Sequence, residues 1–262
     1  MEELIDKISV SKAFSKAAYA YDSLALLQKR LCKELFDRIA QNNFCPKSIL
    51  DIGMGTGLLM QKLSQLYCDS KIVGIDLAFG MSKFARKNNL AVMQADAECL
   101  PFKNSSFDLV VSNLVYQWLD NLETAFFEVS RVMRQNGSFY FTFFGSETLR
   151  ELRSSFAGTK KGQHRVLFNN TFKPEGVDGA RMALEKNHFR EIEISTKIER
   201  ENFKDLFSLV GWLKSIGANR ITKPLFMGKG IWQEANEIYS ANFKDKGLIY
   251  ATFELIKVKA KK

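Results

Sequence analysis

The sequence predicts an α/β protein in which helices cover both faces of a mostly parallel sheet. The first observation behind this class is that short apolar runs alternate with amphipathic stretches between residues 48 and 144. The second is that these apolar runs are nearly continuous, which is typical of strands buried on both faces. The third is a glycine-rich turn at residues 51–57, between the first apolar run and the amphipathic stretch that follows it.

The elements follow this alternation along the chain. Apolar residues at helical spacing, among them Leu24, Leu27, Leu31 and Leu35, predict two N-terminal helices, at 2–16 and 22–41. Five strands are then predicted at 48–51, 71–76, 91–95, 107–112 and 138–144, with helices at 58–67, 80–88 and 122–133. After residue 145 the pattern predicts helices at 146–157, 175–187, 203–216 and 230–241, and strands at 191–198 and 248–258.

The same pattern divides the 262 residues into four segments. We expect an N-terminal helical lid at 1–47 and a core at 48–198. A helical cap at 199–247 is inserted before the last core strand, which lies at 248–262 with the C-terminus. A chain of this length has room for one large domain with such an insertion.

Composition excludes several classes of protein. The chain is 46% hydrophobic and 26% charged, which is ordinary for a globular protein. No apolar run approaches the roughly 20 residues that span a bilayer, and the acidic N-terminus lacks a signal-peptide pattern. Four cysteines without a Cys-x-x-Cys pair, together with two histidines, predict neither a metal site nor a disulfide framework. We therefore expect a cytoplasmic protein with no membrane partner and no bound metal.

The net charge of +9 is distributed unevenly. The first 149 residues carry 16 basic and 16 acidic residues, whereas residues 150–262 carry 22 basic and 13 acidic ones. A basic second half favours an acidic partner, and solubility alone explains it equally well.

The glycine-rich turn reads Asp51-Ile52-Gly53-Met54-Gly55-Thr56-Gly57. Glycines permit a tight turn and let a ligand approach the backbone closely. By itself the turn fits either a nucleotide site or a structural turn, and its Gly-x-Gly-x-Gly spacing differs from the Gly-x-Gly-x-x-Gly of dinucleotide-binding folds. Further polar residues end the next three predicted strands, namely Asp76, Asp96 and Asn113. Open α/β sheets bind ligands at these carboxyl ends, so the four points predict one ligand site.

This constellation resembles the class I methyltransferases. The resemblance implies a Rossmann-like fold with a seven-stranded, mostly parallel sheet, and S-adenosylmethionine as cofactor. It places the amino-acid portion of the cofactor at Asp51, Gly53, Gly55 and Gly57, and the ribose at Asp76. Leu77 would lie beside the adenine, Asp96 and Ala97 at its polar edge, and Asn113 on the side of methyl transfer.

The resemblance narrows to the malonyl-acyl-carrier-protein O-methyltransferases of biotin synthesis. The matching segments include Phe14–Asp22, Ser106–Leu114, Gln117–Leu119, Thr148–Arg153 and Leu213–Asn219. By this resemblance Tyr21 and Gln28 join the cofactor site from the N-terminal helices. Three departures are Met54 in the glycine turn, Gln135-Asn136-Gly137 before strand five, and Tyr116, a residue large enough to narrow the pocket.

The resemblance implies methyl transfer to the free carboxylate of a malonyl thioester carried by an acyl-carrier protein. That carboxylate is ionised at neutral pH and needs no general base, so no catalytic residue is assigned. A cation should select it, and the candidates are Arg150, Arg153 and Arg165, with Trp118 as a wall of the substrate pocket. We expect a monomer, no nucleic-acid partner, and S-adenosylhomocysteine as the second product.

Other functions remain open at this point. A related branch, the assembly factors of respiratory complex I that hydroxylate arginine, shares the Leu-Arg-Glu-Leu region; Tyr21-Asp22 and Gly217-Ala218-Asn219 favour the biotin branch. Another small-molecule methyltransferase is a further alternative. The intact glycine turn argues against a non-catalytic binding module. The run Asn113-Leu114-Val115-Tyr116 lacks the Pro-Pro-aromatic motif of enzymes that methylate bases.

Overall fold

The structure, a computed structural model, describes residues 5–42, 44–160, 176–218 and 228–262. Its sheet has the strand order β3-β2-β1-β4-β5-β8-β6, and a two-residue strand β7 pairs with β8. The strands are β1 (Ser48–Ile52), β2 (Lys71–Asp76), β3 (Val92–Gln94), β4 (Phe107–Asn113), β5 (Met133–Phe144), β6 (Arg190–Phe203), β7 (Lys244–Asp245) and β8 (Leu248–Lys261). The five strands from β3 to β5 are parallel, and β8 is antiparallel to both of its long neighbours. The predicted α/β class with a mostly parallel sheet is confirmed.

Helices cover both faces of this sheet. On one face α3 (Leu26–Ala40) and α4 (Leu58–Leu66) enclose Ile49, Leu109 and Val111. On the other, α6 (Leu122–Val132) and α8 (Gly176–Lys186) enclose a larger core that includes Leu50 and Ile52. Successive residues of a strand point to opposite faces, which is why β1 supplies both cores, through Ile49 on one face and through Leu50 and Ile52 on the other. A fifth helix, α5 (Phe79–Arg86), follows β2.

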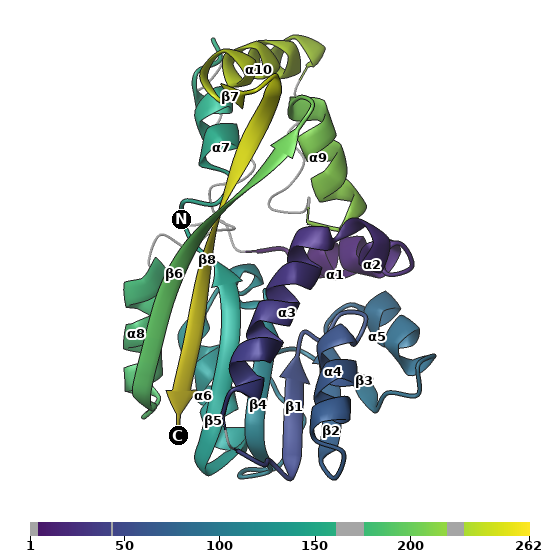
Figure 1. Cartoon of the computed structure of the whole chain (residues 1–262), viewed down its shortest axis with the longest axis vertical. Coiled ribbons are helices and arrows are strands. Elements are labelled where there is room, and N and C mark those ends of the chain that lie inside the picture. The colour runs from purple at the N-terminus through teal and green to yellow at the C-terminus, as the bar shows by residue number, and fades with distance from the viewer. Residues whose placement is uncertain (1–4, 43, 161–175, 219–227) are drawn as a thin grey trace.

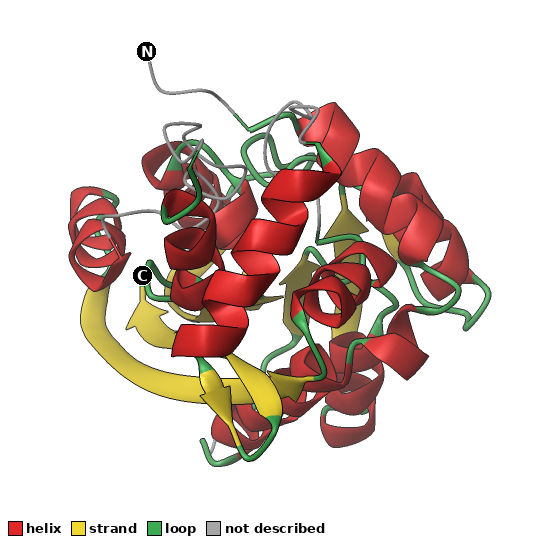
Figure 2. Cartoon of the chain, turned by 90° about the horizontal axis from the view of Figure 1, so that it is seen from above, coloured by secondary structure: helices red, strands yellow, loops and turns green. Residues whose placement is uncertain are grey.

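The upper part of the molecule is a cap built on two long strands. In Figure 1, β6 and β8 leave the sheet as a twisted ribbon, and α7 (Arg150–Ala157), α9 (Leu206–Ser215) and α10 (Lys229–Asn242) surround its far end. These helices and the ribbon enclose a separate apolar core of their own, which includes Phe156, Leu209, Tyr239 and Phe253. Pairing continues to Phe203 opposite Ile249, so β6 runs five residues beyond its predicted end at 198. Figure 2 shows the cap end, with the helices gathered around the curved strands.

Two N-terminal helices lie over the carboxyl ends of the strands. The two that do so are α1 (Lys7–Ala17) and α2 (Tyr21–Leu24), whereas α3 begins at this edge and runs along one face of the sheet. The prediction of one continuous helix at 22–41 is wrong, because the chain leaves helical geometry at Ala25 (φ −87°, ψ 51°). A tertiary contact accompanies the break: the carbonyl of Leu24 accepts a hydrogen bond from the indole of Trp212 in the cap (3.0 Å). No helix among the described residues is long and apolar enough to cross a membrane.

Candidate active site

A cavity of about 760 Å³ opens at the carboxyl ends of β1, β2 and β4, beneath α1. We call it the first chamber. Many of the residues predicted from the strand ends lie in its walls, namely Gly53, Gly55, Asp76, Leu77, Asp96, Ala97 and Asn113. The strand order explains this convergence, since β1 lies between β2 and β4.

The glycine turn needs its glycines for two different reasons. Gly53, Gly55 and Gly57 all have positive φ, a conformation that costs other residues free energy. A side chain at Gly53 would collide with Val115, so this position is closed by the protein itself. At Gly55, in contrast, no protein atom lies within 4 Å of a Cβ position. The backbone of Gly55 is therefore open to a ligand in the chamber.

Asp76 is held at the end of β2 by the glycine turn and by the start of α5. Its Oδ2 accepts a hydrogen bond from the backbone N–H of Gly55 (2.9 Å), and its Oδ1 accepts one from that of Ala78 (2.7 Å). Burial raises the pKa of Asp76 to about 6, although these two N–H groups favour the ionised form. Each carboxylate oxygen has a second lone pair, so two donors of a ligand, such as a pair of ribose hydroxyls, could bind as well.

Asp51 is the penultimate residue of β1 and is 1% exposed. Its Oδ2 has no hydrogen-bond partner among the described residues, and burial, together with the charge of Asp76, raises its pKa well above the usual range. A buried, unpaired carboxylate oxygen costs free energy unless a donor reaches it. Asp51 lies in a smaller pocket behind the glycine turn. We call this pocket the third chamber, and its walls also include Tyr21 and Gln28. A cationic ammonium group fits this position.

Helix α1 forms the roof of the first chamber. The Lys7 ammonium binds the carboxylates of Asp96 (2.7 Å) and Glu98. One turn further, the Ser11 hydroxyl donates a hydrogen bond to the Leu77 carbonyl (2.9 Å). In addition, Asp22 of α2 accepts a hydrogen bond from the Thr56 hydroxyl in the glycine turn (2.7 Å). The N-terminal helices are therefore tied to the same residues that form the floor.

Two predicted residues at the strand ends are engaged by the protein. Asp96 receives Lys7 on one oxygen and the backbone N–H of Glu98 on the other (3.0 Å). The side-chain oxygen of Asn113 accepts a hydrogen bond from the Thr142 hydroxyl of the neighbouring strand (2.8 Å). Both residues stay in the chamber wall, so they shape the chamber and keep part of their surface for a ligand.

A second chamber of about 530 Å³ lies above the first, between the sheet and the cap. Its walls are Phe14, Tyr21, Gln28, Leu114, Gln117, Trp118, Phe144, Leu149, Leu213, Ile216, Ala218 and Phe253. Phe14, Tyr21, Leu114 and Trp118 also line the first chamber, so the two cavities adjoin there. Phe14 packs edge-on against Trp118 (ring centroids 5.4 Å apart). Trp118 is therefore a wall that both chambers share.

Tyr116 does not narrow either chamber. Its ring is fully buried and packs against Phe126 and Phe141, with ring centroids 5.1 and 5.0 Å away. The reason is the short helix η1 (Tyr116–Trp118), in which neighbouring residues point in different directions. It turns Tyr116 into the main core and Gln117 and Trp118 toward the cap.

Comparisons with known proteins agree with this geometry. Residues 50–141 match the family model of a methyltransferase domain. In the solved structures, a Bacillus subtilis protein, YcgJ, has a similar fold (TM-score 0.63, 16% identity, 88% of this chain and 98% of that one). The chain is 33% identical to a malonyl-[acyl-carrier protein] O-methyltransferase of Geobacter sulfurreducens, over 97% of this chain and 98% of that protein. The chain belongs to the malonyl-[acyl-carrier protein] O-methyltransferase family.

This O-methyltransferase family also includes fused proteins. The chain is 32% identical to a biotin biosynthesis bifunctional protein, BioHC, of Saccharophagus degradans, over 95% of this chain and 46% of that protein. The predicted family and the predicted enzyme class are thus confirmed.

In this O-methyltransferase, two of the arginines proposed to hold the substrate carboxylate lie outside the walls of both chambers. Arg150 pairs with Glu147 (2.7 Å) and reaches Glu151 (3.4 Å). Arg153 donates its N–H groups to the carbonyls of Ser146 and Thr148, and burial lowers its pKa. Both guanidinium groups thus stabilise the segment that leads into α7. Arg165 lies outside the described residues.

The structure adds site residues that sequence reasoning did not assign. Lys7, Ser11 and Phe14 line the first chamber from α1, and Gln117 lines the second. A signal was present for the first three, because positions i, i+4 and i+7 share one face of a helix. Gln117 stands beside Trp118 in the family pattern, but its direction depends on the η1 turn.

Proposed function

We propose that this protein transfers a methyl group from S-adenosylmethionine to the free carboxylate of a malonyl thioester on an acyl-carrier protein, in a cytoplasmic pathway to biotin. The observation that carries the proposal is the meeting of two chambers at Tyr21 and Trp118. The first chamber has the polar groups for a nucleoside cofactor. The second is largely apolar and leads toward the cap. The four cysteines, all free thiols in the structure, suit a reducing compartment.

In the first chamber we assign Asp76 to the ribose hydroxyls and Leu77, Asp96 and Ala97 to the surroundings of the adenine. The unpaired oxygen of Asp51 would accept the ammonium group of the cofactor's amino-acid portion, assisted by the open backbone at Gly55. The bound cofactor supplies an electrophilic methyl group on a sulfonium. Asn113, Tyr21 and Gln28 border this portion of the site.

The residues of this chain contribute positioning and exclusion of water. A malonyl carboxylate is ionised at neutral pH, so its oxygen attacks without a general base. It has to lie in line with the methyl group, about 3–3.5 Å away. The pKa of Tyr21 is raised by burial and by the charges of Asp76 and Asp22, so its hydroxyl stays protonated and can donate a hydrogen bond at the junction of the chambers. Phe14 and Trp118 keep this junction apolar.

The lid is best assigned to α1 and α2 rather than to the whole of residues 1–47. Helix α3 packs into the core of the sheet through Leu35 and Ile39, which are each 2% exposed. Its removal would expose that core. In contrast, α1 is attached through Lys7 and Ser11 to residues of the chamber, so it can separate without disturbing the sheet.

The proposal is tested with purified protein, S-adenosylmethionine and malonyl-acyl-carrier protein, followed by intact-protein mass spectrometry. We expect the mass of one added methyl group, and cleavage of the thioester should return the carrier protein to its unmethylated mass because the methyl group lies on the acyl group. Acetyl-acyl-carrier protein, which lacks the free carboxylate, is the matched control and should stay unmodified. Growth of a biotin auxotroph that lacks this methylation step provides the cellular readout. Methylation of the acetyl carrier, or none of the malonyl carrier, would contradict the proposal.

A further inference from the structure

Gln117 is a buried glutamine in the wall of the second chamber, and the protein uses only one end of its amide. The side-chain Nε2 donates a hydrogen bond to the Leu114 carbonyl (2.8 Å). The Oε1 atom has no hydrogen-bond partner among the described residues, and the residue is 3% exposed. A buried acceptor without a donor is costly, so such an atom in a cavity wall points to a ligand.

The orientation of this amide is determined by its surroundings. Leu114 follows β4 with a positive φ of 60°, and its N–H is bound by the carbonyl and the hydroxyl of Thr142 (2.9 and 3.2 Å). The Leu114 carbonyl can only accept a hydrogen bond. Rotating the Gln117 amide by half a turn would set two acceptors against each other. The nitrogen is therefore held at Leu114, and the oxygen is the free end of an amide whose residue lines the second chamber.

The remainder of the chamber shows what kind of group would meet this oxygen. No charged side chain is found among its described lining residues. Its polar side chains are those of Tyr21, Gln28 and Gln117, and the Oε1 atoms of both glutamines are unpaired. Two acceptors repel a carboxylate and attract N–H donors. The malonyl carboxylate thus belongs at the junction with the first chamber, and the second chamber suits a neutral chain that carries amide N–H groups.

Building on the proposed function, we infer that the Oε1 atom of Gln117 accepts a hydrogen bond from the amide N–H nearest the sulfur in the substrate's carrier arm. A thioester of a pantetheine-type arm carries this N–H two carbon atoms from its sulfur. Gln117 precedes Trp118, the wall common to both chambers, so a hydrogen bond here directs the acyl end toward the cofactor. Gln117 is a positioning residue that selects amide-bearing thioesters.

Two small substrates that differ in one donor test the inference with the unaltered protein. Malonyl-S-N-acetylcysteamine carries the N–H, and malonyl-S-(2-acetoxyethyl) thioester replaces it with an ester oxygen of similar size. We expect kcat/KM to be about tenfold or more higher for the amide, because the ester leaves the Gln117 oxygen unpaired and facing another acceptor. Equal kcat/KM values would overturn the inference and leave the proposed function intact. Failure to methylate any malonyl thioester would instead overturn the proposed function.

Variants then assign the discrimination to one residue. In Gln117→Met the ratio of the kcat/KM values for the amide and the ester should fall close to one, mainly because kcat/KM for the amide decreases. The Kd of S-adenosylmethionine should stay within about twofold, because Gln117 lines only the second chamber. Gln28→Met is the matched control. Gln28 also borders the third chamber, where it is assigned to the cofactor. Its variant should therefore change kcat/KM for both substrates by the same factor and retain the ratio.

Three results of the variant experiment would overturn the assignment. One is a Gln117→Met protein that keeps the preference for the amide. Another is an equal decrease of kcat/KM for both substrates, which would make Gln117 only a brace for Leu114. The third is loss of the preference in Gln28→Met alone. If Gln117→Met fails to fold, the substrate pair and the unaltered protein still decide the question.

Discussion

At the scale of single residues, Asp76 at the end of β2 and Asp51 near the end of β1 supply the carboxylates of the first and third chambers. Burial raises the pKa of both carboxyl groups, so the protein without ligand holds its charges in an unfavourable environment. In the proposed complex the hydroxyl and ammonium groups of the cofactor would relieve this, which would make the site selective for a ligand rich in donors. The same side chains are therefore poor choices for stability and good ones for binding.

Asp76→Ala should weaken S-adenosylmethionine binding. The variant removes the acceptor for both ribose hydroxyls and frees the Gly55 and Ala78 N–H groups. A loss of about 1–3 kcal/mol corresponds to a Kd raised about 5- to 150-fold, measured by isothermal titration calorimetry. Asp69→Ala, an exposed position before the other end of β2, is the control and should bind as the unaltered protein does. An unchanged Kd in Asp76→Ala would refute the assignment.

Cofactor affinity should also depend on pH in a defined direction. The ionised form of Asp76 accepts the hydroxyl donors, and its pKa without ligand is raised to about 6. Affinity should therefore be constant above about pH 7 and fall as pH decreases through 6, by about tenfold per pH unit below it for this group. Asp51, whose pKa is raised too, acts in the same direction. Calorimetry across this range measures the effect; a Kd that does not vary down to about pH 5 would contradict it.

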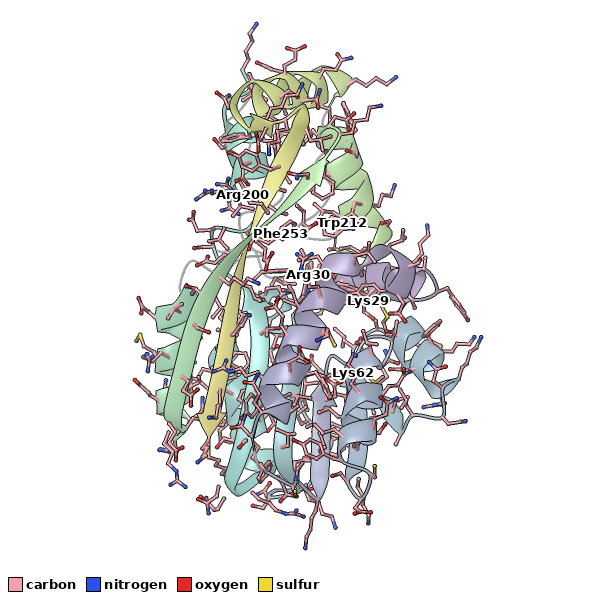
Figure 3. All side chains as sticks on the ribbon, viewed as in Figure 1. Lys29, Arg30, Lys62, Arg200, Trp212 and Phe253 are labelled. Carbon is pink, nitrogen blue, oxygen red and sulfur yellow. The ribbon has the colours of Figure 1, made fainter. Side chains whose placement is uncertain are left out.

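At the scale of elements, the cap and the N-terminal helices meet at two contacts over the chambers. Trp212 of α9 binds the Leu24 carbonyl and packs edge-on against Phe253 of the ribbon, with ring centroids 5.9 Å apart; Figure 3 labels both aromatic residues. Gly217, just after α9, lies so close to α1 that an added Cβ would be 3.0 Å from the Phe14 Cα. Phe14 in turn contacts Trp118 between the chambers. Changes in the cap therefore reach the junction where the substrate and cofactor meet.

Gly217→Ala and Gly211→Ala should have opposite effects on stability. Gly217 has φ +80° and no room toward Phe14, so alanine should lower the free energy of unfolding by about 1–2 kcal/mol. Gly211 lies within α9 with open space around it, so alanine should raise that free energy by about 0.5–1 kcal/mol. Urea unfolding measures both. A Gly217→Ala protein as stable as Gly211→Ala would show that the close contact with α1 is not maintained in solution.

If α1 is a lid, the ion pairs that Lys7 forms should affect how fast the cofactor dissociates. Lys7→Met removes the contacts of α1 with Asp96 and Glu98 on the chamber wall. S-adenosylmethionine should dissociate several-fold faster, as stopped-flow displacement would show, while stability changes by less than about 1 kcal/mol because the pair is partly exposed. Lys12→Met, on the exposed side of the same helix, is the control. Identical dissociation rates in the two variants would argue against a lid at α1.

At the scale of the whole molecule, the basic residues of the second half fall into two groups, those that form ion pairs within the protein and those that do not. On the ribbon, lysines are paired internally: Lys197 and Lys257 with Glu34 of α3, and Lys259 with Glu193. The reverse arrangement also occurs, because Arg30 of α3, labelled in Figure 3, binds Glu199 and Glu201 of β6. On the cap, exposed Lys204, Lys214 and Lys229 form no ion pair with another described residue. The cap is thus the better candidate for an acidic carrier protein.

The dependence of kcat/KM on salt concentration should therefore differ between two substrates. The kcat/KM for malonyl-acyl-carrier protein should drop steeply with ionic strength, and that for malonyl-coenzyme A should drop less, since the Debye length shortens from about 10 Å at 0.1 M to about 3 Å at 1 M salt. Lys214→Glu should impair the carrier substrate selectively; Lys71→Glu, at the amino end of β2, is the control. Arg220, a further basic residue close to Lys214 in the sequence, lies outside the described residues. Equal salt dependence of both substrates would return the basic excess to a role in solubility.

The class of fold followed from the sequence, and so did the grouping of residues around the chamber that we propose for the cofactor, because both depend on local patterns. Nearly continuous apolar strands can only be buried on two faces, and the carboxyl ends of parallel strands meet at one edge. Asp76, Asn113 and the glycine turn were therefore placed in one site by their positions relative to strands. The family resemblance added Tyr21 and Gln28, which no strand pattern identifies, and both lie in the chamber walls.

Only the tertiary structure decided what depends on contacts between distant segments. The helix predicted at 22–41 is divided at Ala25, beside a carbonyl that binds Trp212 from the cap. Charge and position made Arg153 a candidate for the substrate, yet nearby carbonyls take up its N–H groups. The direction of Gln117 was equally beyond the sequence. It follows from the hydrogen bond to Leu114, whose strained backbone is held in turn by Thr142 on another strand.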